Sequence, residues 1–194
     1  KLNTWHVSRI TDMANLFCNK STFDSDISNW DVSSVTNMRN MFGGCVLFNS
    51  DLSSWDVSNV ISFTGMFNGC RLFESDLSGW DVSNALEMIE MFNEANSFNS
   101  DLSNWDVSSA LNMNGMFVGC TLFESDLSGW DVSNVANTAN MFRNAPNFDS
   151  DLSTWNMSNA LNIQGMFADA SSFNSDLSNW DISNVTDMRE VFYN

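Results

Sequence analysis

Hydrophobic side chains recur along this chain at a fixed interval of 25 residues, and polar side chains recur between them at the same interval. All eight Trp residues obey this spacing, from Trp5 to Trp180. The columns that are apolar almost throughout are those of Leu52, Trp55, Val57, Val60, Phe63, Met66, Phe67, Cys70 and Phe73. One unit of this repeat cannot close a core by itself, but stacked copies bury a continuous one. We therefore expect residues 1–194 to form a single solenoid of nearly eight repeats.

The spacing of apolar residues changes within each unit. Residues 55–57 alternate apolar and polar, which predicts a short strand. Residues 60–67 carry apolar side chains at helical spacing, which predicts a short α- or 3-10 helix. The glycines that follow the Met-Phe pair suit a helix-ending turn of left-handed geometry; they are Gly43, Gly44, Gly69 and Gly119. The pattern thus predicts an α/β solenoid of the leucine-rich-repeat kind, a right-handed coil with parallel strands about 4.8 Å apart.

The aromatic columns are the expected core of this solenoid. An outward-facing row of Trp rings would form a ladder that could stack sugars or partner side chains. The alternation of Trp with Val favours the opposite orientation. An exposed patch of eight indoles would also exceed what soluble monomers normally tolerate. The expected core residues are Trp30, Trp55, Trp80, Trp105, Trp130 and Trp155, with Phe42, Phe67, Phe92, Phe117 and Phe142.

The charge of the chain excludes several classes of partner. Its 24 acidic and 7 basic residues give a net charge of −17. A run of cations that could follow phosphates is absent, so nucleic acid and anionic bilayers are not expected as partners. No apolar run approaches the roughly 18 residues of a membrane span. A chain with a single His and two Lys also has few groups for acid–base chemistry.

Asp residues form two columns, one at every 25th position from Asp26 to Asp176 and the other from Asp31 to Asp181. Carboxylates in successive repeats of the stack repel each other by about 1 kcal/mol in water, so a favourable interaction must offset this repulsion. Hydrogen bonds from backbone N–H groups in turns would do so. A row of Ca²⁺ ions is the alternative, although neither an EF-hand nor the glycine-rich calcium repeat is present. Its ligands would be Asp51, Asp56, Asp76, Asp81, Asp101, Asp106, Asp126 and Asp131. Asn156 replaces one Asp, which either role accommodates.

The four Cys residues read as small buried groups. Cys45, Cys70 and Cys120 share a column with Ala residues, which predicts reduced thiols inside the core. A Cys45–Cys70 disulfide is an alternative, since these residues stand on adjacent rungs. A metal site is not expected, because no Cys-x-x-Cys motif or Cys/His pair is present.

The repeated Ser residues, exemplified by Ser28 and Ser33, are turn hydroxyls rather than nucleophiles. A catalytic Ser needs a neighbouring base, and His6 is the only imidazole in the chain. Ice binding by a regular Ser/Thr/Asn array is a remote alternative, which the acidic columns beside the Ser residues disfavour. The sequence thus indicates a protein that is not an enzyme and holds no cofactor, calcium excepted.

Residues 52–73 carry the motif Leu-Ser-x-Trp-Asp-Val-Ser-Asn-Val followed by Met-Phe, Cys and Phe. This motif resembles the BspA-like leucine-rich-repeat surface proteins, the bacterial surface repeat also found in mycoplasma lipoproteins, and the resemblance covers the whole chain. It implies a leucine-rich-repeat-like solenoid at a cell surface or outside the cell, with roles in adhesion or interaction. It transfers no catalytic residues.

Both ends of the chain present ordinary core residues rather than polar caps, which solenoids normally carry. We therefore expect open ends that meet flanking repeats or other copies of the chain, as in a head-to-tail filament. The first hypothesis for function is a structural element, a spacer or filament subunit. The alternative is a surface-displayed adhesin that binds a protein or glycan. Its specificity would depend on the variable residues before each Trp, which are Ser54, Gly79, Asn104, Gly129, Thr154 and Asn179.

Overall fold

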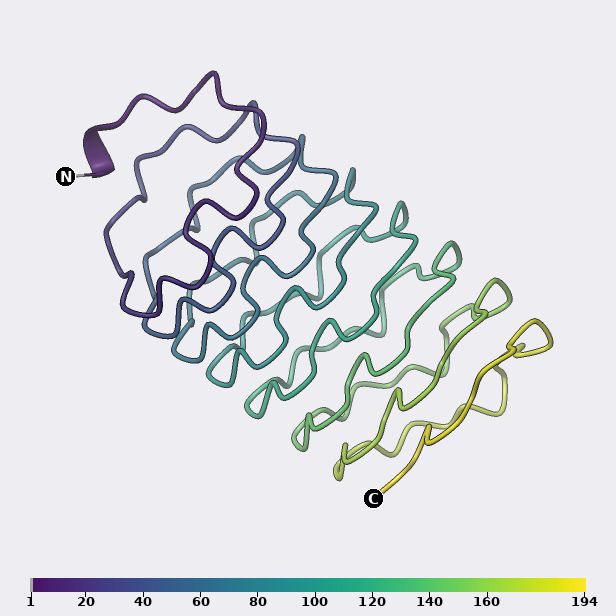
Figure 1. Cartoon of the computed structure of the whole chain (residues 1–194). Coiled ribbons are helices and arrows are strands. Elements are labelled where there is room, and N and C mark those ends of the chain that lie inside the picture. The colour runs from purple at the N-terminus through teal and green to yellow at the C-terminus, as the bar shows by residue number, and fades with distance from the viewer. Residues whose placement is uncertain (1) are drawn as a thin grey trace.

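The computed structural model describes residues 2–194, and these residues form a stack of similar coils that runs from one end of the molecule to the other (Figure 1). Each coil comprises 25 residues, and we call it a rung. Residues that occupy the same place in successive rungs form a column. Within residues 2–194 the one regular element is the 3-10 helix η1, Leu2–Thr4, at the N-terminal end.

Neighbouring rungs are joined by parallel β-bridges, one residue per rung. The bridged residues are Asp12, Asn37, Ser62, Glu87, Asn112, Asn137, Asn162 and Asp187. The expectation of parallel pairing is therefore met, but the strand predicted at residues 55–57 is wrong. Turns close on both sides of that segment, since the N–H of Trp55 donates to the carbonyl of Leu52 and that of Val60 donates to Val57.

The helix predicted over residues 60–67 is wrong as well. Alternate N–H groups here leave their own rung: Phe63 donates to Glu87, and Phe67 donates to Met91. The N–H groups between them close four-residue turns, such as Met66 to Phe63 at 3.0 Å. An α-helix would need every N–H for its own i−4 carbonyl. In this segment, half of those N–H groups donate to the next rung instead. The segment is therefore a series of four-residue turns that is hydrogen-bonded to the next rung, and we call it the turn ladder.

Two columns in this turn ladder have positive φ angles, because four-residue turns of this kind require them at their third residue. The first runs from Asn15 to Glu190 and the second from Asn19 to Asp169, and all their described members have φ between 49° and 75°. Gly44, Gly69 and Gly119 belong to the second column, which confirms the expected left-handed geometry; Gly43 is outside both columns.

Aromatic rings fill the interior in continuous stacks. Phe42 and its equivalents lie 5.6–5.8 Å apart between centroids from rung to rung. Within each rung this ring stacks closely on a second Phe, for example Phe48 at 4.0 Å. The Trp residues from 30 to 155 are at most 4% exposed. All Trp and Phe residues predicted as core between residues 30 and 155 are therefore buried in the stack.

The terminal rungs expose residues of the kind that is buried elsewhere. Trp5 is 58% exposed at the N-terminal end, and Met188 and Phe192 are 54% and 61% exposed at the other. A further rung stacked on either end would cover these side chains. The stacking surface is therefore the same at the ends as between rungs.

Candidate functional site

Asp side chains of both columns accept hydrogen bonds from the residue two positions later. The carboxylate of Asp51 accepts from the N–H of Ser53 at 2.9 Å. The carboxylate of Asp56 accepts from both the N–H and the hydroxyl of Ser58, at 3.1 and 2.6 Å. The same N–H bond recurs at Asp76, Asp81, Asp101, Asp106, Asp126 and Asp131. These are Asx turns, in which a short carboxylate replaces a backbone acceptor.

Asn156 makes the same turn as the Asp residues of its column, since its side-chain oxygen accepts from the N–H of Ser158 at 3.1 Å. A neutral amide therefore satisfies the turn without charge. Among residues 2–194, no group of three or more His, Cys, Asp or Glu side chains is arranged to hold a metal ion. The turns thus support the hydrogen-bonding role of these carboxylates directly, and calcium binding stays a prediction.

The pH dependence of stability follows from these turns. Hydrogen bonds from the hydroxyl and N–H of Ser58 hold the pKa of Asp56 below its ordinary value, although neighbouring Asp31 acts in the opposite direction. Hydrogen bonds from Ser78 and Ser133 lower the pKa of Asp76 and Asp131 in the same way. A lowered pKa stabilises the fold above the unfolded-state value of about 3.9, and this stabilisation is lost as pH falls through the folded-state value. We expect urea midpoints that are level from pH 7 to 5 and that fall below about pH 4.

The control for this titration replaces Asp31, Asp56, Asp81, Asp106 and Asp131 together by Asn, following the example of Asn156. The turns would persist in that variant, and the loss of stability at acidic pH should be smaller. A rise in stability on acidification of the original chain would contradict this account, because it would mean that repulsion between carboxylates outweighs their hydrogen bonds.

The acidic residues are concentrated on part of the surface. The first Asp column and the residues two positions before it line shallow hollows, one of which contains Glu124, Asp126, Asp149 and Asp151. Together with the second Asp column these positions hold 17 of the 24 acidic residues. Hence the strongly negative potential belongs to these columns, and other surfaces of the solenoid carry far less charge.

A third polar column, which the sequence reasoning did not single out, joins the rungs from inside. The hydroxyl of Ser100 accepts from the N–H of Leu77 at 2.9 Å and donates to the carboxylate of Asp76 at 3.2 Å. Ser75, Ser125 and Ser150 are buried in the same way, and each accepts from a Leu N–H of the preceding rung. The presence of Ser at every 25th position from Ser25 to Ser175 was the signal that could have revealed this role.

Indole and thiol groups also donate between rungs. The Nε1–H of Trp105 donates to the carbonyl of Leu77 at 3.0 Å. The thiol of Cys70 donates to the carbonyl of Phe42 at 3.1 Å. All four Cys residues are free, and no Cys45–Cys70 disulfide is present. Burial raises the pKa of Cys45 to about 11 and that of Cys70 further. These buried thiols are therefore protonated and unreactive at neutral pH.

The Ser residues considered as nucleophiles are engaged in turns. The hydroxyl of Ser28 donates to Asp26 at 2.7 Å, and that of Ser33 donates to Asp31 at 2.6 Å. His6 is exposed on the N-terminal rung. The arrangement at Ser28 and Ser33 is thus a cap for a turn, in which the hydroxyl proton is directed at a carboxylate.

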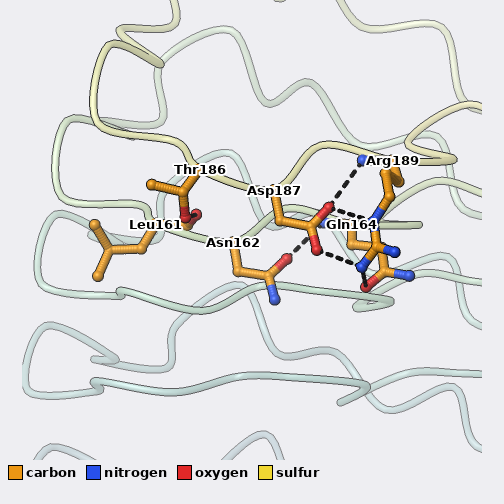
Figure 2. A network of polar contacts seen from close by, with 6 residues as sticks. All are labelled: Leu161, Asn162, Gln164, Thr186, Asp187 and Arg189. Atoms are coloured by element: carbon orange, nitrogen blue, oxygen red, sulfur yellow. Dashed lines mark hydrogen bonds and ion pairs between the residues drawn. The ribbon is translucent and has the colours of Figure 1, made fainter.

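One column of the surface is apolar. Ile61, Leu86, Leu111, Ala136 and Leu161 directly precede the bridged residues, and we call these five side chains the apolar stripe. Its four large side chains are 36–49% exposed. Thr36 and Thr186 occupy the column on either side of it. Figure 2 shows the C-terminal end of this surface, where Leu161 and Thr186 lie beside Asn162 and the Asp187–Arg189 ion pair, whose closest atoms are 2.7 Å apart.

Within residues 2–194, none of the helical segments has the length and hydrophobicity of a membrane span. Comparison with curated proteins yields no match. Among solved structures, a leucine-rich repeat protein from Bacteroides ovatus ATCC 8483 is similar at 12% sequence identity with a TM-score of 0.35. The match covers 93% of this chain and 64% of that protein, so the chain spans less than two thirds of its length.

Two segments of the sequence, residues 1–104 and 87–194, match the family described as "Mycoplasma protein of unknown function, DUF285". Together they extend over the whole chain, which confirms the resemblance to mycoplasma and BspA-like repeats noted from residues 52–73. The repeat of Trp, Phe, Asp and Ser columns seen in the structure is therefore the repeat of a known family, and this chain belongs to DUF285.

Proposed function

We propose that this chain is a non-enzymatic structural element, a stiff spacer displayed at a cell surface or outside the cell. The observation that carries this proposal is the repetition of the same contacts between every pair of interior rungs. Each junction combines a backbone turn ladder, an indole–carbonyl bond and stacked Phe rings, as between Phe67 and Phe92 at 5.6 Å. A spacer needs this uniformity, since its end-to-end distance must not depend on one weak junction.

The polar interior supports the same function. Every buried side-chain nitrogen or oxygen within residues 2–194 has a hydrogen-bond partner. The hydroxyl of Ser100 and the indole N–H of Trp105 both form hydrogen bonds between neighbouring rungs. A solenoid connected in this way resists bending and shear, because any displacement of one rung breaks several bonds together. The location at a cell surface rests on the resemblance to BspA-like proteins.

Binding of a protein or glycan is the second function that we retain. The residues before each Trp are exposed while their neighbours hardly vary, and they range from Gly79 to Asn104 and Thr154. The hydroxyl of Thr154 donates to the carbonyl of Ser128 in the preceding rung at 3.0 Å, but Gly79 in the same column has no such group, so the stack does not depend on this bond. These positions would supply the specificity of an adhesin.

The spacer function is tested by lengthening the solenoid in register. Residues 101–150 are duplicated after residue 150, which adds two rungs, and spin labels near both ends report their separation. We expect an increase of about 10 Å with an unchanged cross-section in solution scattering, given about 4.8 Å per rung. An unchanged separation, or a thicker particle, would argue against a stiff spacer. Specific binding to a glycan or protein array that is lost when Asn104 and Thr154 are replaced would favour the adhesin.

A further inference from the structure

The apolar stripe lies outside the columns that carry most of the acidic residues. Among the residues two positions before and one position after each stripe residue, Glu87 is the charged one, and the others are Asn or Ser. Most carboxylates lie instead in the two Asp columns and the column that contains Glu124. A second copy of a chain with a net charge of −17 is repelled wherever carboxylates face each other. The stripe is a surface on which two copies can meet without that cost.

The backbone under the stripe is regular. The N–H of Leu111 donates to the carbonyl of Leu86 at 3.0 Å, and that of Leu161 donates to Ala136 at 2.9 Å. These bonds belong to the bridged ladder, so the stripe residues are spaced evenly by one rung. Two identical stripes therefore have matching periods and can meet at every rung rather than at one point.

The order of side chains along the stripe suits an antiparallel pairing with itself. Leu111 is the middle residue of the five, and a two-fold axis through it places Ile61 opposite Leu161 of the second copy. Leu86 then faces Ala136, a large side chain against a small one. The same axis sets Glu87 against the rung of Asn137 rather than against another carboxylate. A parallel pairing would instead set every large side chain against its own copy.

From these observations we infer that two copies of this chain associate side by side through the apolar stripe, antiparallel, about a two-fold axis at Leu111. Four rung intervals give the stripe a length of about 20 Å. A contact of this length and one to two columns of width is small for a protein interface, so the dimer is weak and forms at micromolar rather than nanomolar concentration. This contact is distinct from stacking at the solenoid ends, and it would pair spacers laterally.

Sedimentation velocity over a concentration range from about 1 to 300 μM tests the association. We expect a monomer–dimer equilibrium that shifts toward dimer when NaCl is raised, because salt screens the repulsion between the acidic columns. Leu111→Glu should weaken dimerisation at least tenfold. Leu122→Glu is the matched control, since Leu122 is 49% exposed in a different column and the substitution adds the same charge. It should leave the dimer unchanged.

The register is tested by oxidative cross-linking in a Cys18→Ala background, which removes the one partly exposed native thiol. Leu111→Cys should form a disulfide with its own copy. Ile61→Cys should cross-link to Leu161→Cys when the two variants are mixed, and it should not cross-link to itself. Cross-linking of Ile61→Cys to itself would overturn the antiparallel register.

A chain that stays monomeric at 300 μM and high salt would overturn the inference, as would a dimer that Leu122→Glu disrupts and Leu111→Glu does not. These outcomes are separable from failure of the spacer function, which depends on the separation of the labelled ends. A monomer whose ends move apart on insertion of two rungs would still be a spacer.

Discussion

Replacement of Trp105 by Ala is expected to lower the free energy of unfolding by about 3–5 kcal/mol. The indole is 3% exposed in a central rung and packs against Phe92 and Trp130, with centroids 6.3 and 6.4 Å away. Its removal creates a cavity and also deprives the carbonyl of Leu77 of its indole donor. The carbonyl of Leu77 keeps its bond from the N–H of Trp80 at 3.0 Å, so the cavity and the lost packing make up most of the cost and the lost indole hydrogen bond adds a smaller part.

Urea denaturation followed by circular dichroism measures this effect, and Trp5→Ala is the matched control. Trp5 belongs to the same column but is 58% exposed on the terminal rung, where its ring stacks on Trp30 from one side. Its replacement should cost much less than that of Trp105. A change of less than about 0.5 kcal/mol at Trp105 would contradict an inward-facing Trp column.

Gly69→Val is expected to destabilise the protein by roughly 2–3 kcal/mol. Gly69 has a φ of 74°, a conformation that β-branched residues adopt only with strain. Space is not the obstacle, since an added Cβ would lie 3.6 Å from the nearest atom, the Cα of Gly44. The cost therefore comes from the backbone angle that the turn ladder imposes.

Gly79→Val is the control for this substitution, because Gly79 lacks a positive φ and an added Cβ meets nothing within 4 Å. It should change stability by less than about 0.5 kcal/mol. The reverse experiment is Glu94→Gly at a position with φ of 57°, which should raise stability by about 0.5–1 kcal/mol. Equal effects of Val at positions 69 and 79 would show that the turn ladder does not constrain φ.

The repeat could be recognised in full from the sequence. Because every interior rung has the same environment, the same residue type recurs at the same position of each repeat. The columns of Trp105 and Phe92 therefore identify the core even when the fold is not known. The turn role of Asp56 was also foreseeable, since an Asp two residues before a Ser suits an Asx turn. The free thiol of Cys70 fits the pattern of a column shared with Ala.

The predicted helix and strand were wrong for a common reason. Periodicity reports which side chains face the core, and a turn ladder whose side chains alternate in groups can present the same spacing as a short helix. The deciding factor is the partner of each N–H group. That of Phe63 donates to Glu87, which is 24 residues away along the chain. The positive φ angles of Glu90 and Glu94 could not be predicted from residue type, because Glu is uncommon in that conformation.

The inward Ser column and the apolar stripe are two further features that the sequence pattern did not reveal and the structure did. Ser100 is as regular in sequence as Ser103, yet the first bridges two rungs from a buried position and the second donates its N–H to Asp101 within one turn. Leu111 and Leu102 are both Leu residues within one rung, but one is 46% exposed and the other is buried. Residue type alone does not distinguish them.

The sequence alone thus determined the register of the solenoid, its core columns and its family. This was possible because each rung buries the same set of hydrophobic positions, so the pattern recurs every 25 residues. The secondary structure, the polar bonds between rungs and the exposure of the apolar stripe are decided by how the rungs stack. These features depend on which atoms of one rung lie against the next, and that neighbour is supplied by a residue about 25 positions away rather than by the adjacent sequence.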